Sequence, residues 1–196
     1  MHGVKVTDRL GFGDHPMLTH FRYLKGISGD VIARMTIPSP GVLHFRGGRK
    51  MIDATVYPDL EDYFNDLALT WRQAIRAFYD AGCCYLQLDD TAWACLCSED
   101  QQSQIREWGD CPQALAATYA EVVNKTIEGK PDYLTIGLHV CRGRFRSTWI
   151  AEGGYEPVAE ILFGGVNIDA FFLEYDNERF GGFEPLTLLL GPVNSR

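Results

Sequence analysis

The pattern that most constrains this chain is the alternation of short apolar runs with longer amphipathic segments. The short runs are rich in apolar and β-branched residues, and they predict four or five strands, at 31–37, 85–89, 133–141, 168–176 and 185–190. The longer segments carry apolar residues three or four positions apart, and they predict helices at 58–81, 112–128 and 155–163. This alternation predicts a parallel sheet with right-handed crossover connections.

The size and composition of the chain favour one globular domain. We expect residues 1–196 to form a single domain, with an irregular entry segment at 1–30 and βα units over 31–190. A short helix or an edge segment is expected at 21–24. No apolar run approaches the roughly 20 residues of a membrane span, and the first residues lack a signal peptide's apolar core. We therefore expect a cytoplasmic protein that binds no membrane.

The formal net charge of −8 argues against nucleic acid as a partner. Basic residues gather only in the segment Arg142–Arg146, which could hold an anionic group of a small substrate or could be a solvated loop. Two further loops are expected, at 43–49 and between Thr91 and Cys111. The first mixes aromatic, basic and glycine residues, a composition that can carry function on a rigid scaffold.

The six cysteines do not predict a disulfide framework, because the chain is large and has no secretory signal. Cys83 and Cys84 are expected to behave as small buried apolar residues. The pair Cys95 and Cys97 could bind a metal, although C-x-C alone is a weak signal.

Polar residues follow the predicted strands at their carboxyl ends. These residues are Ser39, Asp89, His139, Cys141 and Glu174. In a parallel α/β sheet or barrel the carboxyl ends of the strands lie on one side, where binding sites are built. The coincidence of five such residues is stronger evidence for a site than any one of them.

His139 and Cys141 are two apart on a strand, so their side chains share one face. Imidazole, thiolate and carboxylate are all zinc donors, and Glu174 on the next strand is a third candidate ligand. Three protein ligands would leave an open position, as in catalytic zinc sites. The alternative for His139 is an ordinary core histidine.

Asp89 precedes His139 in the predicted strand order and would face the same site. Its carboxylate could hold a substrate ammonium or take part in proton transfer, and Ser39 is a second candidate for substrate binding. The alternative is a capping role, for which Asp90 is better suited than Asp89. Zinc lowers the pKa of a bound thiol, so a site of this kind suits a thiol substrate.

The strand-end motifs resemble the catalytic domain of cobalamin-independent methionine synthase, and they fit its shorter stand-alone relatives best. The similarity extends over most of residues 31–186. The segments that carry it are Gln87–Asp90, His139–Cys141, Phe172–Tyr175, Thr36–Pro40, Leu43–Gly48, Arg146–Trp149 and Glu152–Pro157.

The resemblance implies a (β/α)8 TIM barrel of which this chain holds four to five of the eight units. It implies zinc, homocysteine as the methyl acceptor, and a methylated folate or another methyl donor, with methionine as the product. His139, Cys141 and Glu174 match three zinc ligands of the family, and Asp89 matches the carboxylate that binds the homocysteine amine.

The chain also departs from the family pattern. Relative to the family we expect it to be truncated at both ends, without the early Gly-Ser-Phe motif, the substrate-binding Glu, the late proton-donating His and the second zinc-binding cysteine. Cys95 stands where the larger synthases carry an acidic residue for the folate. Because half a barrel exposes sheet edges, we expect a homo-oligomer or a complementing chain.

Two alternative functions remain open from the sequence. Zinc could act as a Lewis acid in a lyase or hydrolase reaction on the same barrel. The chain could also be a non-catalytic truncated or split subunit that requires a partner chain.

Overall fold

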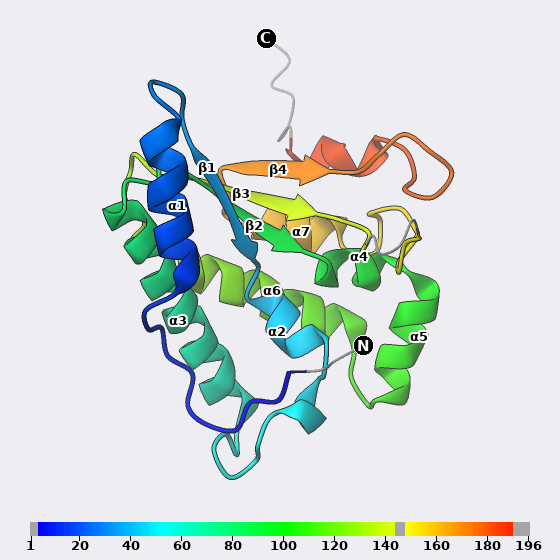
Figure 1. Cartoon of the computed structure of the whole chain (residues 1–196). Helices are drawn as coiled ribbons and strands as arrows, with labels where there is room; N and C mark the ends of the chain where they lie inside the picture. The colour runs from blue at the N-terminus through cyan, green and yellow to red at the C-terminus, as the bar shows by residue number, and fades with distance from the viewer. Residues whose placement is uncertain (1–3, 144–147, 190–196) are drawn as a thin grey trace.

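A computed structural model describes residues 4–143 and 148–189 of the chain. Its centre is a four-stranded sheet in the order β1-β2-β3-β4, in which every neighbouring pair is parallel (Figure 1). The strands are β1 (Arg34–Pro38), β2 (Tyr85–Asp90), β3 (Thr135–Val140) and β4 (Ala170–Leu173). The predicted α/β class is therefore confirmed, and four parallel strands with crossover helices are consistent with part of a TIM barrel.

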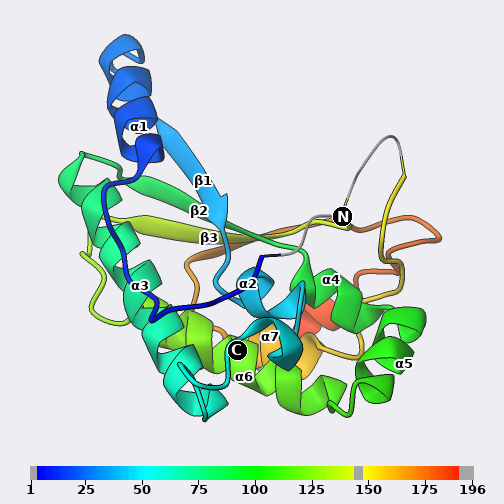
Figure 2. The same cartoon turned by 60° about the horizontal axis from the view of Figure 1, so that its bottom comes forward.

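Helices cover one face of this sheet, as Figure 2 shows. The covering helices are α3 (Leu60–Asp80), α6 (Pro112–Ile127) and α7 (Ala159–Gly165). Side chains alternate across a strand, and those of Leu86, Leu88, Ile136 and Leu138 are fully buried in the main core with these helices. Asp89 and His139 occupy the alternate positions and are only partly buried, so the site residues lie on the other face of the sheet.

Helix α3 forms where the apolar period predicts it. The side chain of its N-cap residue, Asp59, accepts a hydrogen bond from the backbone N–H of Glu61. At its other end Gly82 has φ of +90° and donates its N–H to the carbonyl of Tyr79. Gly82 is therefore the predicted C-terminal stop, at a position where a residue with a Cβ would be strained.

Three predicted loops or irregular segments are in fact helical. Residues 1–30 contain α1 (Pro16–Ile27), a helix longer than the one considered at 21–24. The expected loop at 43–49 contains the end of α2 (Gly41–Phe45) and the start of the 3-10 helix η1 (Arg49–Met51). The long loop after Thr91 contains α4 (Ala92–Cys97) and α5 (Glu99–Glu107).

The short helix α4 was missed because its capping residue is not at the usual position. Asp90 Oδ1 accepts hydrogen bonds from the backbone N–H groups of Ala92 and Trp93, at 2.7 and 3.4 Å. All six residues of α4 are buried, so its sequence shows no amphipathic period. The capping role considered for Asp90 is confirmed by these contacts.

The predicted fifth strand at 185–190 is wrong. The described part of this segment belongs to the 3-10 helix η2 (Glu184–Leu189), whose Leu186 packs against the main core. A short apolar run fits a strand or a buried helical turn equally well, and periodicity alone cannot separate the two.

Among the described residues, no helix is long and apolar enough to cross a membrane.

Candidate functional site

The register of the sheet brings the predicted site residues together. Asp89 of β2 is paired with His139 of β3, and Pro38 of β1 is paired with Asp89. Beyond the strand ends, the N–H of Ser39 donates to the carbonyl of Asp89 at 2.8 Å, and the N–H of Cys141 donates to the carbonyl of Asp90 at 3.2 Å. The carboxyl ends of these three strands therefore meet at one edge.

Three side chains at this edge form a group with metal-ligand chemistry. One potential ligand atom from each of Asp89, His139 and Cys141 lies within 4.8 Å of the others. Asp89 Oδ1 lies 2.5 Å from His139 Nδ1, and both side chains are partly open to solvent. A carboxylate, an imidazole and a thiol are a donor set that zinc and related divalent cations accept.

The electrostatics of Cys141 also fit a cation at this place. Burial raises the pKa of its thiol, and the negative charges of Asp89 and Glu174 act in the same direction. Burial and the neighbouring carboxylates thus disfavour a thiolate in the protein alone. A divalent cation bound among these groups would offset that cost, because its charge favours the thiolate.

Glu174 lies next to this group but outside the set of atoms that converge. It follows β4, one residue beyond the pair that joins Val140 and Leu173, and so stands level with Cys141. Its backbone N–H donates to the hydroxyl of Tyr155 at 3.3 Å. The third ligand atom of the compact group comes from Asp89, whereas the sequence pointed to Glu174.

Ser39 lies beneath the site rather than on its surface. Its side chain is fully buried, and its hydroxyl lies beside the buried carboxylate of Asp90, to which it donates a hydrogen bond. Burial also raises the pKa of Asp90 to about 6, against the hydrogen bonds that this carboxylate accepts from Ser39 and from the backbone of α4. A substrate on the open face would reach Asp89 before either of these groups.

The basic segment is only partly described, since residues 144–147 lie outside the described ranges. Arg142 is fully buried, with its guanidinium 4.6 Å from the ring centre of Tyr155 and 5.0 Å from that of Phe180. Arg142 is therefore not part of a solvated loop. Cys97 lies beside it, and burial raises the pKa of that thiol to about 11 although the guanidinium opposes the shift.

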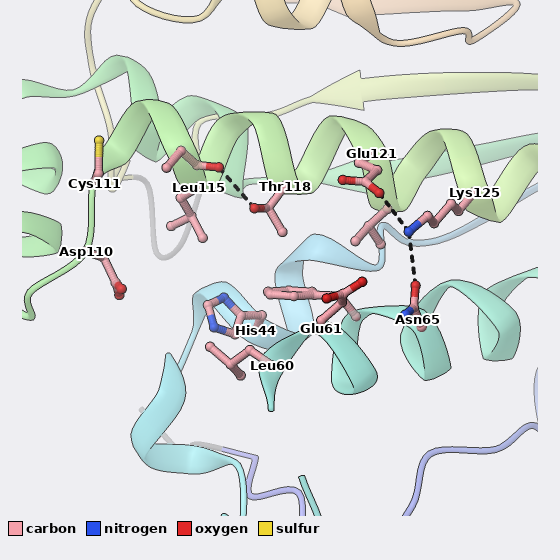
Figure 3. A pocket seen from close by; sticks show the side chains of 13 residues that line it. His44, Leu60, Glu61, Asn65, Asp110, Cys111, Leu115, Thr118, Glu121 and Lys125 are labelled. Atoms are coloured by element: carbon pink, nitrogen blue, oxygen red, sulfur yellow. Dashed lines mark hydrogen bonds and ion pairs between the residues drawn. The ribbon is translucent and has the colours of Figure 1, made fainter. Parts of the chain in front are cut away.

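A separate cavity of about 360 Å³ lies between α3 and α6 (Figure 3). His44 lines it, and the sequence singled out the loop of His44 without assigning it a role. His44 Nδ1 lies 2.9 Å from the hydroxyl of Tyr119, while Nε2 is shielded from solvent and has no hydrogen-bond partner among the described residues. Burial lowers the pKa of His44 to about 4, so the imidazole is neutral at pH 7.

This cavity offers no converging donor set. Lys125 at one end is already paired with Glu121 at 2.7 Å and with Asn65 at 3.0 Å, as the dashed lines in Figure 3 show. Within the described ranges, the only group of three or more side chains with converging metal-ligand atoms is the one at the strand ends. In the part of the chain that the structure describes, Asp89, His139 and Cys141 are therefore the candidate metal site.

Known proteins with similar sequences extend well beyond this chain. No family model matches the sequence. YxjG of Bacillus subtilis (strain 168), described as uncharacterized, is 46% identical over 202 residues, which span 99% of this chain and 53% of YxjG. YxjH of the same organism, also described as uncharacterized, is 47% identical over 183 residues, which span 93% of this chain and 48% of YxjH. The chain thus spans about half the length of these relatives.

A solved structure connects the fold with the motifs at the strand ends. A Listeria monocytogenes protein, provisionally named a vitamin-B12-independent methionine synthase, is 44% identical with a TM-score of 0.76. The match covers 96% of this chain and 52% of that protein. The predicted resemblance to the cobalamin-independent methionine synthases is confirmed.

A more distant methionine synthase has the same fold. The B12-independent enzyme of Shewanella sp. W3-18-1, solved in complex with selenomethionine, is 16% identical with a TM-score of 0.61. The match covers 91% of this chain and 48% of the enzyme, and at this identity it shows the fold alone. This chain thus matches about half the length of each solved structure.

The buried His44 predicts a specific pH dependence of stability. Its folded-state pKa of about 4 lies below the usual 6.5, so the unfolded chain binds this proton first as the pH falls. Protonation of His44 in the unfolded chain therefore favours unfolding in acid. The contribution of His44 should lower the free energy of unfolding by about 3 kcal/mol between pH 7 and pH 4. Urea unfolding at several pH values measures the loss.

The matched variants are His44→Gln and His20→Gln, the second at an exposed position of α1. His44→Gln should remove most of this pH dependence, whereas His20→Gln should retain it. The comparison with wild type is needed because the raised pKa of Asp90 contributes with the opposite sign in all three proteins. Equal slopes in wild type and His44→Gln would contradict the assignment.

Proposed function

We propose that this chain is a zinc-dependent methyltransferase domain of the methionine synthase type. It would transfer a methyl group to homocysteine or a related thiol and form methionine or its analogue. The observation that carries the proposal is the group of Asp89, His139 and Cys141 at the carboxyl edge of the sheet, in a chain that is 44% identical to about half of a provisionally named synthase. The types of donor atom, their place at the strand ends and the sequence similarity all favour a zinc site of the methionine synthase type.

His139 and Cys141 would hold the zinc ion, with Glu174 as a third protein ligand. Bound zinc would lower the pKa of the substrate thiol, so that a thiolate nucleophile forms near neutral pH. Asp89 would accept hydrogen bonds from the substrate ammonium and orient the amino acid beside the metal. The methyl donor is left open, because Cys95, in the position of the family's folate-binding acid, is a buried residue of α4.

We also propose that a second polypeptide, or a second copy of this chain, completes the barrel. Among the described residues, β1 and β4 are the outer strands of the sheet. A cavity of about 510 Å³ lined largely by apolar residues lies beside β4, and Phe183 and Leu189 nearby are 54% and 42% exposed. Exposed apolar surface beside a sheet edge favours association.

The zinc site is tested by metal analysis of wild-type protein, His139→Ala and Cys141→Ala. Wild type should retain zinc through gel filtration, and both variants should lose it. Cys84→Ala is the matched control, since Cys84, which the sequence wrongly predicted to be buried, is an exposed cysteine outside the group. Equal zinc in all four proteins would rule out the proposed ligands.

The thiol chemistry is tested with cobalt-substituted protein. Homocysteine should add a sulfur-to-cobalt charge-transfer band, whereas homoserine, which carries a hydroxyl in place of the thiol, should not. Methionine formation from homocysteine is then assayed with several methyl donors. A metal spectrum that homocysteine leaves unchanged would favour the Lewis-acid alternative over methyl transfer.

The completion of the barrel is tested by sedimentation velocity at increasing protein concentration. We expect a dimer or larger species, or else binding to the part of YxjG that this chain does not span. Either association should bury apolar surface and raise the midpoint of thermal unfolding. A stable, folded monomer that ignores the added YxjG segment would contradict the proposal.

A further inference from the structure

The contact between Asp89 and His139 has a consequence for how a metal binds. Asp89 Oδ1 lies 2.5 Å from His139 Nδ1, and the two residues are cross-strand partners in β2 and β3. Paired residues in neighbouring strands carry their side chains on the same face of the sheet, and the strands lie about 4.7–4.9 Å apart. The contact is therefore built into the register of the sheet.

A carboxylate at this place decides which nitrogen of the imidazole carries the proton. A carboxylate only accepts hydrogen bonds, so Nδ1 must be the protonated nitrogen when it contacts Asp89. Nε2 then keeps its lone pair in the neutral ring. In metal sites the ligating histidine commonly donates its other N–H to a carboxylate, which fixes both the tautomer and the orientation of the ring.

We propose that Asp89 is a positioning residue that fixes His139 with Nδ1 protonated and Nε2 free to bind the metal. This inference rests on the proposed zinc site but assigns Asp89 a role that does not depend on the substrate. Oδ1 holds the imidazole, and the Asp89 side chain is 42% exposed, so Oδ2 can receive the substrate ammonium. One oxygen of this carboxylate would thus orient the metal-binding histidine, and the other would bind the ammonium of the amino acid.

Two substitutions separate these roles. Asp89→Asn keeps an oxygen acceptor for Nδ1–H but loses the negative charge. Asp89→Ala loses both. We expect Asp89→Asn to keep the tautomer of His139 and most of the zinc affinity while it raises the KM for homocysteine.

In Asp89→Ala the His139 ring should lose its preference for a protonated Nδ1, and the zinc affinity should fall by about 10- to 100-fold. Asp132→Ala is the matched control, because it removes an exposed carboxylate from the opposite end of the β3 segment. This control should change neither property.

The direct readout is the nitrogen chemical shifts of the histidine rings in metal-free protein at pH 8, assigned with His139→Gln. Wild type should show a protonated Nδ1 and an unprotonated Nε2 at His139, and Asp89→Ala should lose this preference. A wild-type ring with the proton on Nε2 would overturn the proposal, as would unchanged zinc affinity in Asp89→Ala.

The metal-free measurement also separates this proposal from the proposed function. A protein that shows the expected tautomer and binds zinc through His139 but transfers no methyl group would contradict the methyltransferase assignment alone. The positioning role of Asp89 would stand in that case.

Discussion

The parallel register of β2 and β3 is the constraint on which the site depends. It places Asp89 opposite His139, and the alternation of side chains then brings Cys141 to the same face. A shift of one residue would turn these side chains into the layer occupied by Leu88 and Leu138, which are fully buried under the helices. The apolar pattern that buries one face of the sheet therefore also fixes the chemistry on the other.

The edge of the sheet combines groups that disfavour ionisation of the Cys141 thiol in the protein alone. The Cys141 thiol is partly buried, and the charges of Asp89 and Glu174 add to the cost of its ionisation. The neighbouring Asp90 is buried, and its carboxylate accepts a hydrogen bond from the backbone N–H of Ala92 in the first turn of α4. A divalent cation bound here would favour the thiolate, and the side chains of Asp89, His139 and Cys141 are of the types that zinc accepts as ligands.

Much of the fold could be predicted because its signals are local. The period of α3, its Asp59 cap and its Gly82 stop are all legible in the sequence, and α6 begins at Pro112 as expected. The helix α4 could not be predicted, because its six residues are all buried and its cap, Asp90, belongs to the preceding strand. The strand predicted at 185–190 was wrong for a related reason, since a short apolar run fits a strand and a buried helical turn equally well.

The candidate site was predictable in place but not in detail. The sequence located Asp89, His139 and Cys141 at strand ends, whereas the contact between Asp89 and His139 depends on a register that no local pattern gives. The burial of Ser39 and Arg142 likewise comes from helices and rings that pack over them. Polar residues near a strand end can face the open edge or the core, and only the fold decides which.

X-ray absorption at the zinc edge tests the central claim most directly. Zinc-loaded protein should show one sulfur near 2.3 Å, from Cys141, together with nitrogen and oxygen neighbours near 2.0–2.2 Å. Homocysteine should add a second sulfur at about the same distance. A first shell of nitrogen and oxygen alone, unchanged by homocysteine, would contradict a zinc site that activates a thiol.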